Sequence, residues 1–267
     1  MLISQIAFVA NPQKPEAVNA CVDAMNIAQE KGYGCKRFSM ETLDCSCIAD
    51  VELLVVIGGD GTILKAASCA AFYDIPILGV NLGRVGFLSE ISPEQFGWAL
   101  DELKNAKAYY DQRMTLDCWV NGVAVAQNCL NDLLLYKRSF SGVAYIGMEI
   151  NGIDAGSVFC DGLIVSTPTG ATGYSISAGG PVIAPGLDVA IVTPVCPHSL
   201  YMRPIVAAAD ADLAFRMLSE GSLYADGRFV AELEEHDSLR ITRSSKSVRF
   251  VRVIEQNLYT LMRKKLS

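Results

Sequence analysis

The sequence predicts an N-terminal α/β domain with a parallel sheet, followed by a larger β-rich domain. Over about the first hundred residues, short aliphatic runs alternate with helical patterns, as in parallel β-α-β units. Further along, Asn-Gly pairs at 121–122 and 151–152 separate β-like runs, and Asn-Gly favours the tight turn of an antiparallel hairpin. We place the domains at residues 1–105 and 106–249, and we expect residues 250–267 to pack back on the first domain.

The first domain contains three predicted strands and three predicted helices. Continuous aliphatic runs are typical of strands in a parallel sheet, because helices bury both of its faces. The predicted strands are Leu2–Ala10, Leu53–Ile57 and Ile75–Val80. The predicted helices are Pro15–Lys31, which Gly32 ends, then Ile63–Phe72, and one from the capping-box sequence Ser92-Pro93-Glu94-Gln95 to about Ala106.

The second domain is predicted to consist mainly of strands, since alternating patterns and turn residues dominate it. They are Leu116–Val120, Val123–Ala126, Ala144–Ile150, Ile153–Phe159, Leu163–Ser166, Ala190–Thr193, Leu213–Leu218, Leu239–Thr242 and Val248–Val253. The stretch Glu255–Lys265 has a helical pattern.

The composition excludes several classes of protein. Of the 267 residues, 51% are hydrophobic and 19% charged, which excludes a disordered, collagen-like or low-complexity chain. Lys and Arg number 22 against 29 Asp and Glu, so the formal charge is −7 and argues against binding nucleic acid or an acidic membrane through a basic surface. Anionic small molecules stay possible, because backbone N–H groups, helix N-termini or a divalent cation also bind phosphate.

Cysteine and histidine narrow the choice further. The nine cysteines include no C-x-x-C pair, and two histidines cannot form a multi-histidine metal centre. We therefore expect reduced, core-filling thiols in a cytoplasmic protein. The first residues lack a basic region, and no apolar run reaches about 18 residues, so neither a secretory signal nor a membrane span is expected.

The leading motif is Gly-Gly-Asp-Gly-Thr at 58–62, directly after a buried strand and before a helix. Its glycines let the backbone approach a ligand, and the N–H groups at the helix start attract an anion. It is not a Rossmann loop, since Leu64 stands where the third glycine belongs, and the chain contains no P-loop sequence. Because Asp60 would repel phosphate, its carboxylate suggests a general base or a cation ligand. The alternative is a tight turn whose Asp caps the helix.

Two further motifs point to a nucleoside. The Thr167–Tyr174 stretch offers hydroxyls, glycines and one aromatic ring, which suit a purine and a ribose better than a metal, although such a stretch can also be a plain loop. Asn131 and Asp132 stand at the head of an apolar run. A buried polar pair there needs partners, such as vicinal sugar hydroxyls, unless it only forms a strand-entry turn.

Together the motifs resemble those of the NAD kinase family. They are G-G-D-G-T at 58–62, N-D at 131–132, D-G-L-I-V-S-T-P-T-G-A-T-G-Y at 161–174 with S-A-G-G-P at 177–181, and P-H-S-L-Y-M-R-P-I-V at 197–206. They occur in the family's order and cover the chain from about residue 2 to residue 255. The first motif alone is shared with diacylglycerol and sphingosine kinases, whereas the combination is specific.

The resemblance implies the two-domain NAD kinase architecture and transfer of the γ-phosphate of ATP to the 2′-hydroxyl of the adenosine ribose of NAD, with Mg²⁺ or another divalent cation. Asp60 would be the general base and a possible metal ligand. The implied NAD-binding residues are Gly59, Asp60, Gly61, Asn131, Asp132, Asp161, Thr169, Thr172, Gly173 and Tyr174. The implied phosphate and ATP contacts are Gly58, Gly59, Gly61, Thr62 and Arg84.

The sequence departs from the family pattern at several positions and matches it at some others whose role the pattern does not define. Asp132 replaces the usual glutamate, and Ala171, Gly173 and Arg228 also differ from the family's usual residues. His198 and Arg203 match a segment in which a structural role is at least as plausible as a catalytic one, and Asp226-Gly227 resembles a late D-G-Q turn.

The resemblance suggests a homodimer or homotetramer formed through the β-rich half, with neither nucleic acid nor membrane as partner. Two alternatives stay open: a lipid kinase that shares the glycine loop, and a non-catalytic NAD(P)-binding sensor.

Overall fold

The computed structural model describes residues 3–41, 43, 45–83, 86–199, 201–254 and 260–263. Its contacts divide the chain into two compact units. Unit 1 comprises Met1–Gln112 with Val248–Ser267, and unit 2 comprises Arg113–Ser247. Two strands, β5 (Tyr109–Val120) and β16 (Ser238–Arg252), therefore contribute residues to both units.

Unit 1 is built on a parallel sheet. Its strands are β1 (Gln5–Ala10), β2 (Gly34–Ser39), β3 (Leu53–Ile57) and β4 (Ile77–Val80), in the order β2-β1-β3-β4, with the end of β16 beside β4. All pairs in this set are parallel. Every residue of β3 and β4 is buried, as expected for aliphatic strands covered on both faces.

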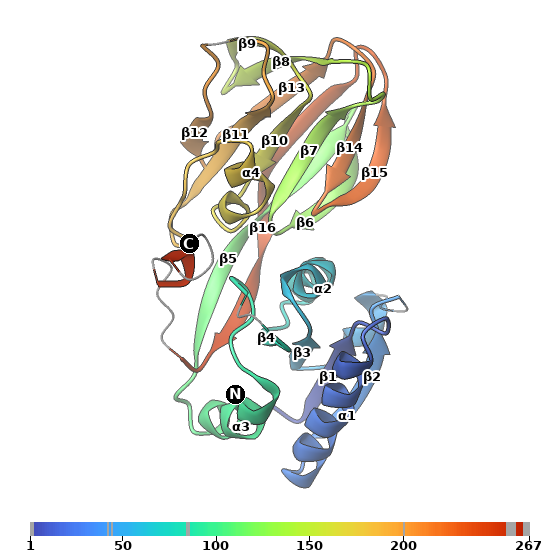
Figure 1. Cartoon of the computed structure of the whole chain (residues 1–267), viewed down its shortest axis with the longest axis vertical. Coiled ribbons are helices and arrows are strands. Elements are labelled where there is room, and N and C mark those ends of the chain that lie inside the picture. The colour runs from blue at the N-terminus through green and yellow to red at the C-terminus, as the bar shows by residue number, and fades with distance from the viewer. Residues whose placement is uncertain are drawn as a thin grey trace. The chain divides into compact units, whose positions relative to one another are not determined.

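The helices that accompany this sheet include α1 (Pro15–Glu30), α2 (Asp60–Phe72) and α3 (Phe96–Lys104) (Figure 1). Small buried residues line the inner face of α1 at helical spacing, namely Ala17, Cys21, Ala24 and Ala28. Two short 3₁₀ helices, η1 (Cys45–Ile48) and η2 (Pro93–Gln95), lie in the connections. The α/β class predicted for the N-terminal part of the chain is confirmed.

The local expectations for unit 1 were largely right. The strand over Leu53–Ile57 is found as predicted, and the Ser92 capping box is present with a single 3₁₀ turn before α3. Helix α2 begins at Asp60 instead of Ile63, so Asp60 itself lies in its first turn. Strand β2 was not predicted, because its partly exposed sequence Gly-Cys-Lys-Arg-Phe-Ser has no apolar run.

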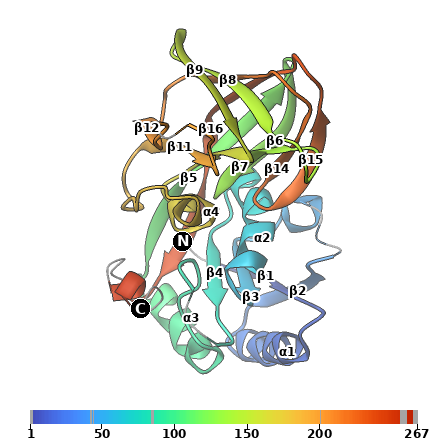
Figure 2. The same ribbon diagram turned by 45° about the horizontal axis from the view of Figure 1, so that its top comes forward.

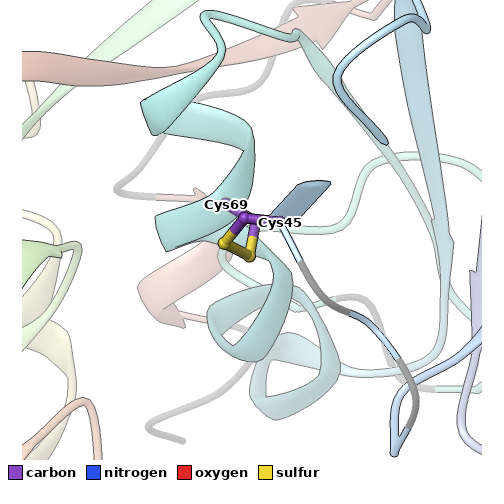
Figure 3. The surroundings of a disulfide bond; sticks show 2 residues. All are labelled: Cys45 and Cys69. Atoms are coloured by element: carbon purple, nitrogen blue, oxygen red, sulfur yellow. A yellow bond between two sulfur atoms is a disulfide. The ribbon is translucent and has the colours of Figure 1, made fainter. Parts of the chain in front are cut away.

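The expectation that all nine cysteines are reduced is wrong. Cys45 in η1 and Cys69 in α2 form a disulfide, with their Cα atoms 4.7 Å apart (Figure 3). The sequence could not reveal this pair, because only folding brings residues 24 positions apart together. The free thiols of Cys21, Cys118, Cys129 and Cys160 are buried, and burial raises the pKa of Cys118 to about 12.

Unit 2 contains two sets of strands. An antiparallel six-stranded sheet has the order β12-β11-β10-β7-β14-β15. Its strands are β7 (Asp132–Lys137), β10 (Gly162–Ser166), β11 (Val189–Val195), β12 (Ile205–Ala208), β14 (Gly221–Ala225) and β15 (Arg228–Leu233). The second set has the order β16-β13-β8-β9, with β5 paired to both β16 and β6. Its remaining strands are β6 (Val123–Cys129), β8 (Ala144–Ile150), β9 (Ile153–Cys160) and β13 (Leu213–Met217).

Alternate residues of the six-stranded sheet enter one apolar core. Leu133 and Leu135 of β7 and Leu163 and Val165 of β10 all belong to it. The intervening residues therefore face the opposite side, where a 3₁₀ turn η3 (Gly170–Thr172) leads into the short helix α4 (Tyr174–Ser177). Helix α4 contacts β10 (Figure 1). In the turned view it lies below β11 (Figure 2).

Both Asn-Gly hairpins are confirmed, with positive φ angles at both turn residues in each: Asn121 and Gly122, Asn151 and Gly152. The two strands predicted over 239–242 and 248–253 are parts of one long strand, β16. Strands β12, β14 and β15 were not predicted.

The helix predicted over 255–265 falls mostly outside the described residues. Within that range the structure describes residues 260–263, which are helical. Within the described part of the chain, no helix is both long and apolar enough to cross a membrane.

Candidate active site

The glycine loop of unit 1 is a sharp connection from β3 to α2. Gly58 has a φ of 153°, and a Cβ there would lie 2.6 Å from the Oγ1 of Thr62, so only glycine fits. At Gly59 and Gly61 a Cβ would meet nothing within 4 Å. The loop is therefore tightly packed at its base and open on its outer side, where a ligand can approach the backbone.

A cavity of about 360 Å³ lies beside this loop. It is lined by Asn11, Pro12, Gln13, Lys14, Met40, Glu41, Gly59, Gly61, Thr62 and Lys65. These residues follow the carboxyl ends of β1, β2 and β3. The strand order reverses between β1 and β3, because β2 lies outside β1 and β4 lies outside β3. Open parallel sheets bind ligands at such switch points, so the topology itself marks this cavity as a ligand site.

The cavity also has cationic side chains that the sequence analysis missed. Lys14 comes just before α1 and Lys65 lies in the second turn of α2, and both line the cavity together with Glu41. Lys65 could have been predicted as a phosphate contact, because it is a basic residue three positions after the glycine loop. Arg84, the predicted phosphate contact, lies outside the described residues.

The carboxylate of Asp60 is held by a second loop of unit 1. The backbone N–H of Phe87 donates to Oδ2 at 2.8 Å and that of Leu88 to Oδ1 at 3.1 Å. A Cβ on Gly86 would lie 1.9 Å from Oδ1 of Asp60, so the loop can approach this closely only with glycine there. Buried Ser89 fixes the loop by accepting the Gly86 N–H at 3.0 Å. A carboxylate oxygen has two lone pairs, so these two hydrogen bonds orient the group and do not by themselves prevent it from accepting a proton or contacting a cation.

In unit 2, the structure brings Asn131 and Asp132 together with the 167–174 segment. The Thr167 N–H donates to the Asn131 carbonyl at 2.9 Å, and a Cβ on Gly170 would lie only 2.1 Å from that oxygen. A Cβ on Gly173 would be 3.3 Å from the Nδ2 of Asn131. The two motifs therefore form one polar cluster on the side of the sheet opposite the core.

Asp132 is buried, and burial raises the pKa of its carboxyl to about 7, with the negative charge of Asp226 as a second cause. On the neighbouring strand its register partner is Ser166, whose buried hydroxyl has no hydrogen-bond partner among the described residues. This part of the cluster therefore keeps unused hydrogen-bonding capacity.

The other predicted NAD contacts differ in burial and in hydrogen-bond partners. Buried Thr169 accepts a hydrogen bond from Arg113 Nη1 at 3.2 Å, and the Thr172 hydroxyl donates to the Thr169 carbonyl. Tyr174 is 42% exposed. Asp161 pairs with Lys137 Nζ at 2.7 Å, and this hydrogen bond raises the pKa of the lysine.

His198 and Arg203, which match the last family motif, make hydrogen bonds to backbone carbonyls. The backbone N–H of His198 donates to the Phe159 carbonyl, and Nη1 of Arg203 donates to the neighbouring Met202 carbonyl. Among the described residues, no group of three or more His, Cys, Asp or Glu side chains could hold a metal ion.

Comparisons with known proteins agree with these features. Residues 16–109 match the model of the ATP-NAD kinase N-terminal domain, and residues 130–253 match that of the ATP-NAD kinase C-terminal domain. The chain is 35% identical to the NAD kinase of Moorella thermoacetica, covering 99% of this chain and 89% of that protein. It is 38% identical to the NAD kinase of Magnetococcus marinus, covering 80% and 73%.

Solved structures share the fold. Yeast NADH kinase in complex with NADH has a TM-score of 0.90 at 21% identity, covering 99% of this chain and 87% of that one. An NAD kinase from Archaeoglobus fulgidus in complex with ATP has a TM-score of 0.79 at 24% identity, covering 97% and 98%. Both family models match, and together they cover most of the sequence; the relatives are 35% and 38% identical. The chain therefore belongs to the NAD kinase family.

Proposed function

We propose that this protein transfers the γ-phosphate of ATP to the 2′-hydroxyl of the adenosine ribose of NAD, giving NADP and ADP. The observation that carries the proposal is the fixed carboxylate of Asp60 at the start of α2, on a loop that borders a cavity at the switch point of a parallel sheet. Phosphoryl transfer needs little more from a protein than positioning, proton removal and charge neutralisation.

The phosphates of ATP bind at the glycine loop in this proposal. Gly58, Gly59, Gly61 and Thr62 present backbone to the ligand, and the positive end of α2 favours negative charge. Lys65 and the predicted contact Arg84 add local positive charge in a protein whose net charge is negative. The divalent cation, Mg²⁺ or a similar ion, arrives with ATP as part of the substrate, and Asp60 is its possible protein ligand.

Asp60 acts as the general base. Its carboxylate takes the proton from the ribose 2′-hydroxyl, and that oxygen then forms a bond with the γ-phosphorus. The bond between the γ-phosphorus and the oxygen bridging to the β-phosphate breaks, and ADP leaves. The hydrogen bonds from Phe87 and Leu88 fix the orientation of the carboxylate before substrate binds.

NAD is recognised mainly by the polar cluster of unit 2. Asn131 and Asp132 bind the adenosine moiety, and Thr172, Gly173 and Tyr174 contact the adenine. Asp161 and Thr169 complete the set, and Gly59 and Gly61 contact NAD from the glycine loop.

We also propose a cytoplasmic homodimer or homotetramer, formed through residues 106–249. Large apolar side chains are exposed on unit 2, among them Phe140 at 98%, Ile153 at 71% and Phe159 at 47%. Phe159 stacks on Tyr145 with ring centroids 3.9 Å apart. Exposed aromatic side chains are enriched at protein interfaces. The cytoplasmic location is proposed because the enzyme consumes ATP and NAD; the Cys45–Cys69 disulfide removes the argument from reduced thiols.

One assay tests the proposal. The purified protein is incubated with ATP, Mg²⁺ and NAD, and NADP is detected with a strictly NADP-dependent dehydrogenase. We expect NADP to form in proportion to enzyme and time. The absence of NADP together with thermal stabilisation by NAD would instead indicate a sensor, and phosphorylation of diacylglycerol would indicate a lipid kinase.

A further inference from the structure

The carboxylate of Asp226 accepts backbone hydrogen bonds from the residues that lead into β7. The N–H of Leu130 donates to Oδ2 at 2.9 Å, and the N–H groups of Asn131 and Asp132 donate to Oδ1 at 2.7 and 3.2 Å. In return, the N–H of Asp226 donates to the carbonyl of Asp132 at 2.9 Å. Four hydrogen bonds thus connect one side chain and its backbone to a segment about 95 residues earlier in the chain.

The geometry of the β14–β15 turn makes this contact possible. Asp226 and Gly227 have φ angles of 48° and 73°, so the turn is tight, and its first residue is an aspartate in the left-handed region. Strand β14 pairs with β7, which places the turn at the head of β7. Asparagine and aspartate tolerate this conformation better than other residues with side chains, so a short acidic residue suits both the backbone and the contact.

We propose that Asp226 is a positioning residue for NAD binding, because its carboxylate holds Asn131 and Asp132 in the orientation that binds the adenosine moiety. This inference rests on the proposed function. Asp226 acts through the backbone of Asn131 and Asp132 and need not touch the substrate. Because those two residues bind the adenosine moiety, loss of the Asp226 carboxylate should weaken NAD binding and leave the chemical step unchanged.

The charge of Asp226 adds a consequence that a neutral structural residue would not have. Burial first, and the charge of Asp226 second, raise the pKa of Asp132 to about 7. Burial also raises the pKa of Asp226, whereas its three backbone hydrogen bonds and the charge of Arg228 act in the opposite direction. Other charged or titratable groups lie near this cluster. Burial and then the charge of Asp226 raise the pKa of Cys129, and the charge of Asp132 helps to raise that of Tyr174. Arg113 donates to Thr169.

The sign of the pH effect follows from the carboxylate. An ionised Asp132 accepts hydrogen bonds from ribose hydroxyls with both oxygens, and protonation removes part of that capacity. With a pKa of about 7, the ionised fraction is small at pH 6 and large at pH 8. The KM for NAD of the wild-type enzyme should therefore be higher at pH 6 than at pH 8, by at most about tenfold.

Two substitutions separate positioning from charge. Asp226→Asn removes the charge and one of the hydrogen-bond acceptors, so we expect the KM for NAD at pH 8 to rise about tenfold, with kcat and the KM for ATP within about twofold of wild type. Because the neighbouring charge is gone, the pKa of Asp132 falls, and the difference in KM between pH 6 and pH 8 should shrink to about threefold. Asp226→Glu keeps the charge but displaces the acceptor oxygens, so it should raise the KM for NAD and keep the wild-type pH dependence.

Asp237→Asn is the matched control. Asp237 also holds a turn of unit 2 through its carboxylate. It accepts the Glu234 N–H at 2.7 Å and the Nδ2 of Asn121 at 2.7 Å, and neither donor belongs to the segment that leads into β7. Its KM for NAD should stay at the wild-type value at both pH values.

The outcomes are distinct. A KM for NAD within twofold of wild type in both Asp226 variants would overturn the proposal, as would a loss of kcat with an unchanged KM, which a merely structural role predicts. If the Asn variant does not fold, Asp226→Glu and the wild-type pH profile decide, and a wild-type KM that does not rise toward pH 6 would count against it. Failure of the wild-type protein to make any NADP would instead overturn the proposed function.

Discussion

In unit 1 the carboxylate of Asp60 lies half-buried at the start of a helix and accepts two backbone N–H bonds, whereas in unit 2 that of Asp132 is buried beside a second carboxylate. The first arrangement orients a charged group that a ligand can still reach. The second raises the pKa of a carboxyl to about 7 and places it opposite the hydroxyl-bearing Ser166 on the neighbouring strand. Unit 1 is thus suited to phosphoryl transfer, and unit 2 to the recognition of a neutral, hydroxyl-rich nucleoside.

The sheets explain the contrast. A parallel sheet directs loops and helix N-termini to the carboxyl ends of its strands, so backbone groups form the site of unit 1. An antiparallel sheet with one face on the core leaves its other face for side chains, and there Asp132 and Ser166 are register partners. Substitutions in unit 1 should therefore lower kcat or weaken ATP binding, and those in unit 2 should weaken NAD binding.

Asp60→Asn should have the largest effect on turnover. General-base removal typically costs about 10²–10⁴ in rate, so we expect kcat to fall by that factor while the protein stays folded. The measurement is steady-state NADP formation together with a thermal unfolding curve. Asp101→Asn, at an exposed ion pair of the same unit, is the control. Full activity in a folded Asp60→Asn variant would show that Asp60 is not the base.

Gly86→Ala tests whether the backbone of unit 1 determines the position of the base. The new Cβ would lie 1.9 Å from Oδ1 of Asp60, so the carboxylate must move. Misplacing a catalytic group by about 1 Å can cost about 10²-fold, and we expect kcat to fall by about that much. Gly83→Ala is the matched control in the same connection, because a Cβ there meets nothing within 4 Å. Equal kcat values for the two variants would rule out this role of the loop.

The disulfide makes the units differ in their response to reductant. Cys45 and Cys69 are bonded in unit 1, whereas the cysteines of unit 2 are free thiols. For a bond that closes 24 residues, reduction should lower the free energy of unfolding of unit 1 by about 3 kcal/mol. The measurement is urea unfolding with and without dithiothreitol. Cys47→Ser, in the same 3₁₀ helix, should respond like wild type, and Cys45→Ser should not respond. A wild-type curve that reductant leaves unchanged would argue against the bond.

Lys65→Gln should have the smallest effect. The side chain lines the cavity beside the glycine loop and is exposed, so solvent screens its interaction with phosphate. We expect the KM for ATP to rise about three- to tenfold, with the KM for NAD unchanged. Lys104→Gln, an exposed lysine in the last turn of α3, is the control. A change confined to the KM for NAD would place Lys65 outside the ATP site.

The parts of this account that were predictable from the sequence are local. The five aliphatic residues Leu53–Ile57 followed by the glycine motif predicted a buried strand, a tight turn and a helix, because each of these depends on neighbouring residues. The two Asn-Gly pairs predicted their hairpins for the same reason. The same signal was available at Asp226-Gly227, whose flanking strands β14 and β15 were nevertheless missed.

The parts that were not predictable depend on contacts between distant segments. Gly86 is required mainly because Asp60, 26 positions earlier in the chain, occupies the space where its side chain would be. Asp226 matters only because β14 pairs with β7 and brings its carboxylate to the start of that strand. The partner of Cys45 likewise depends on how η1 packs against α2. Pattern and composition carry no direct information on these pairings.

The division of roles is tested most directly by titrating NAD, without ATP, into the wild-type protein, Asp60→Asn and Asp132→Asn in a calorimeter at pH 8. We predict that Asp60→Asn binds NAD with a Kd within about threefold of wild type, since the amide still hydrogen-bonds a hydroxyl, and that Asp132→Asn binds about tenfold more weakly. The opposite order, with NAD affinity lost in Asp60→Asn and kept in Asp132→Asn, would contradict the account.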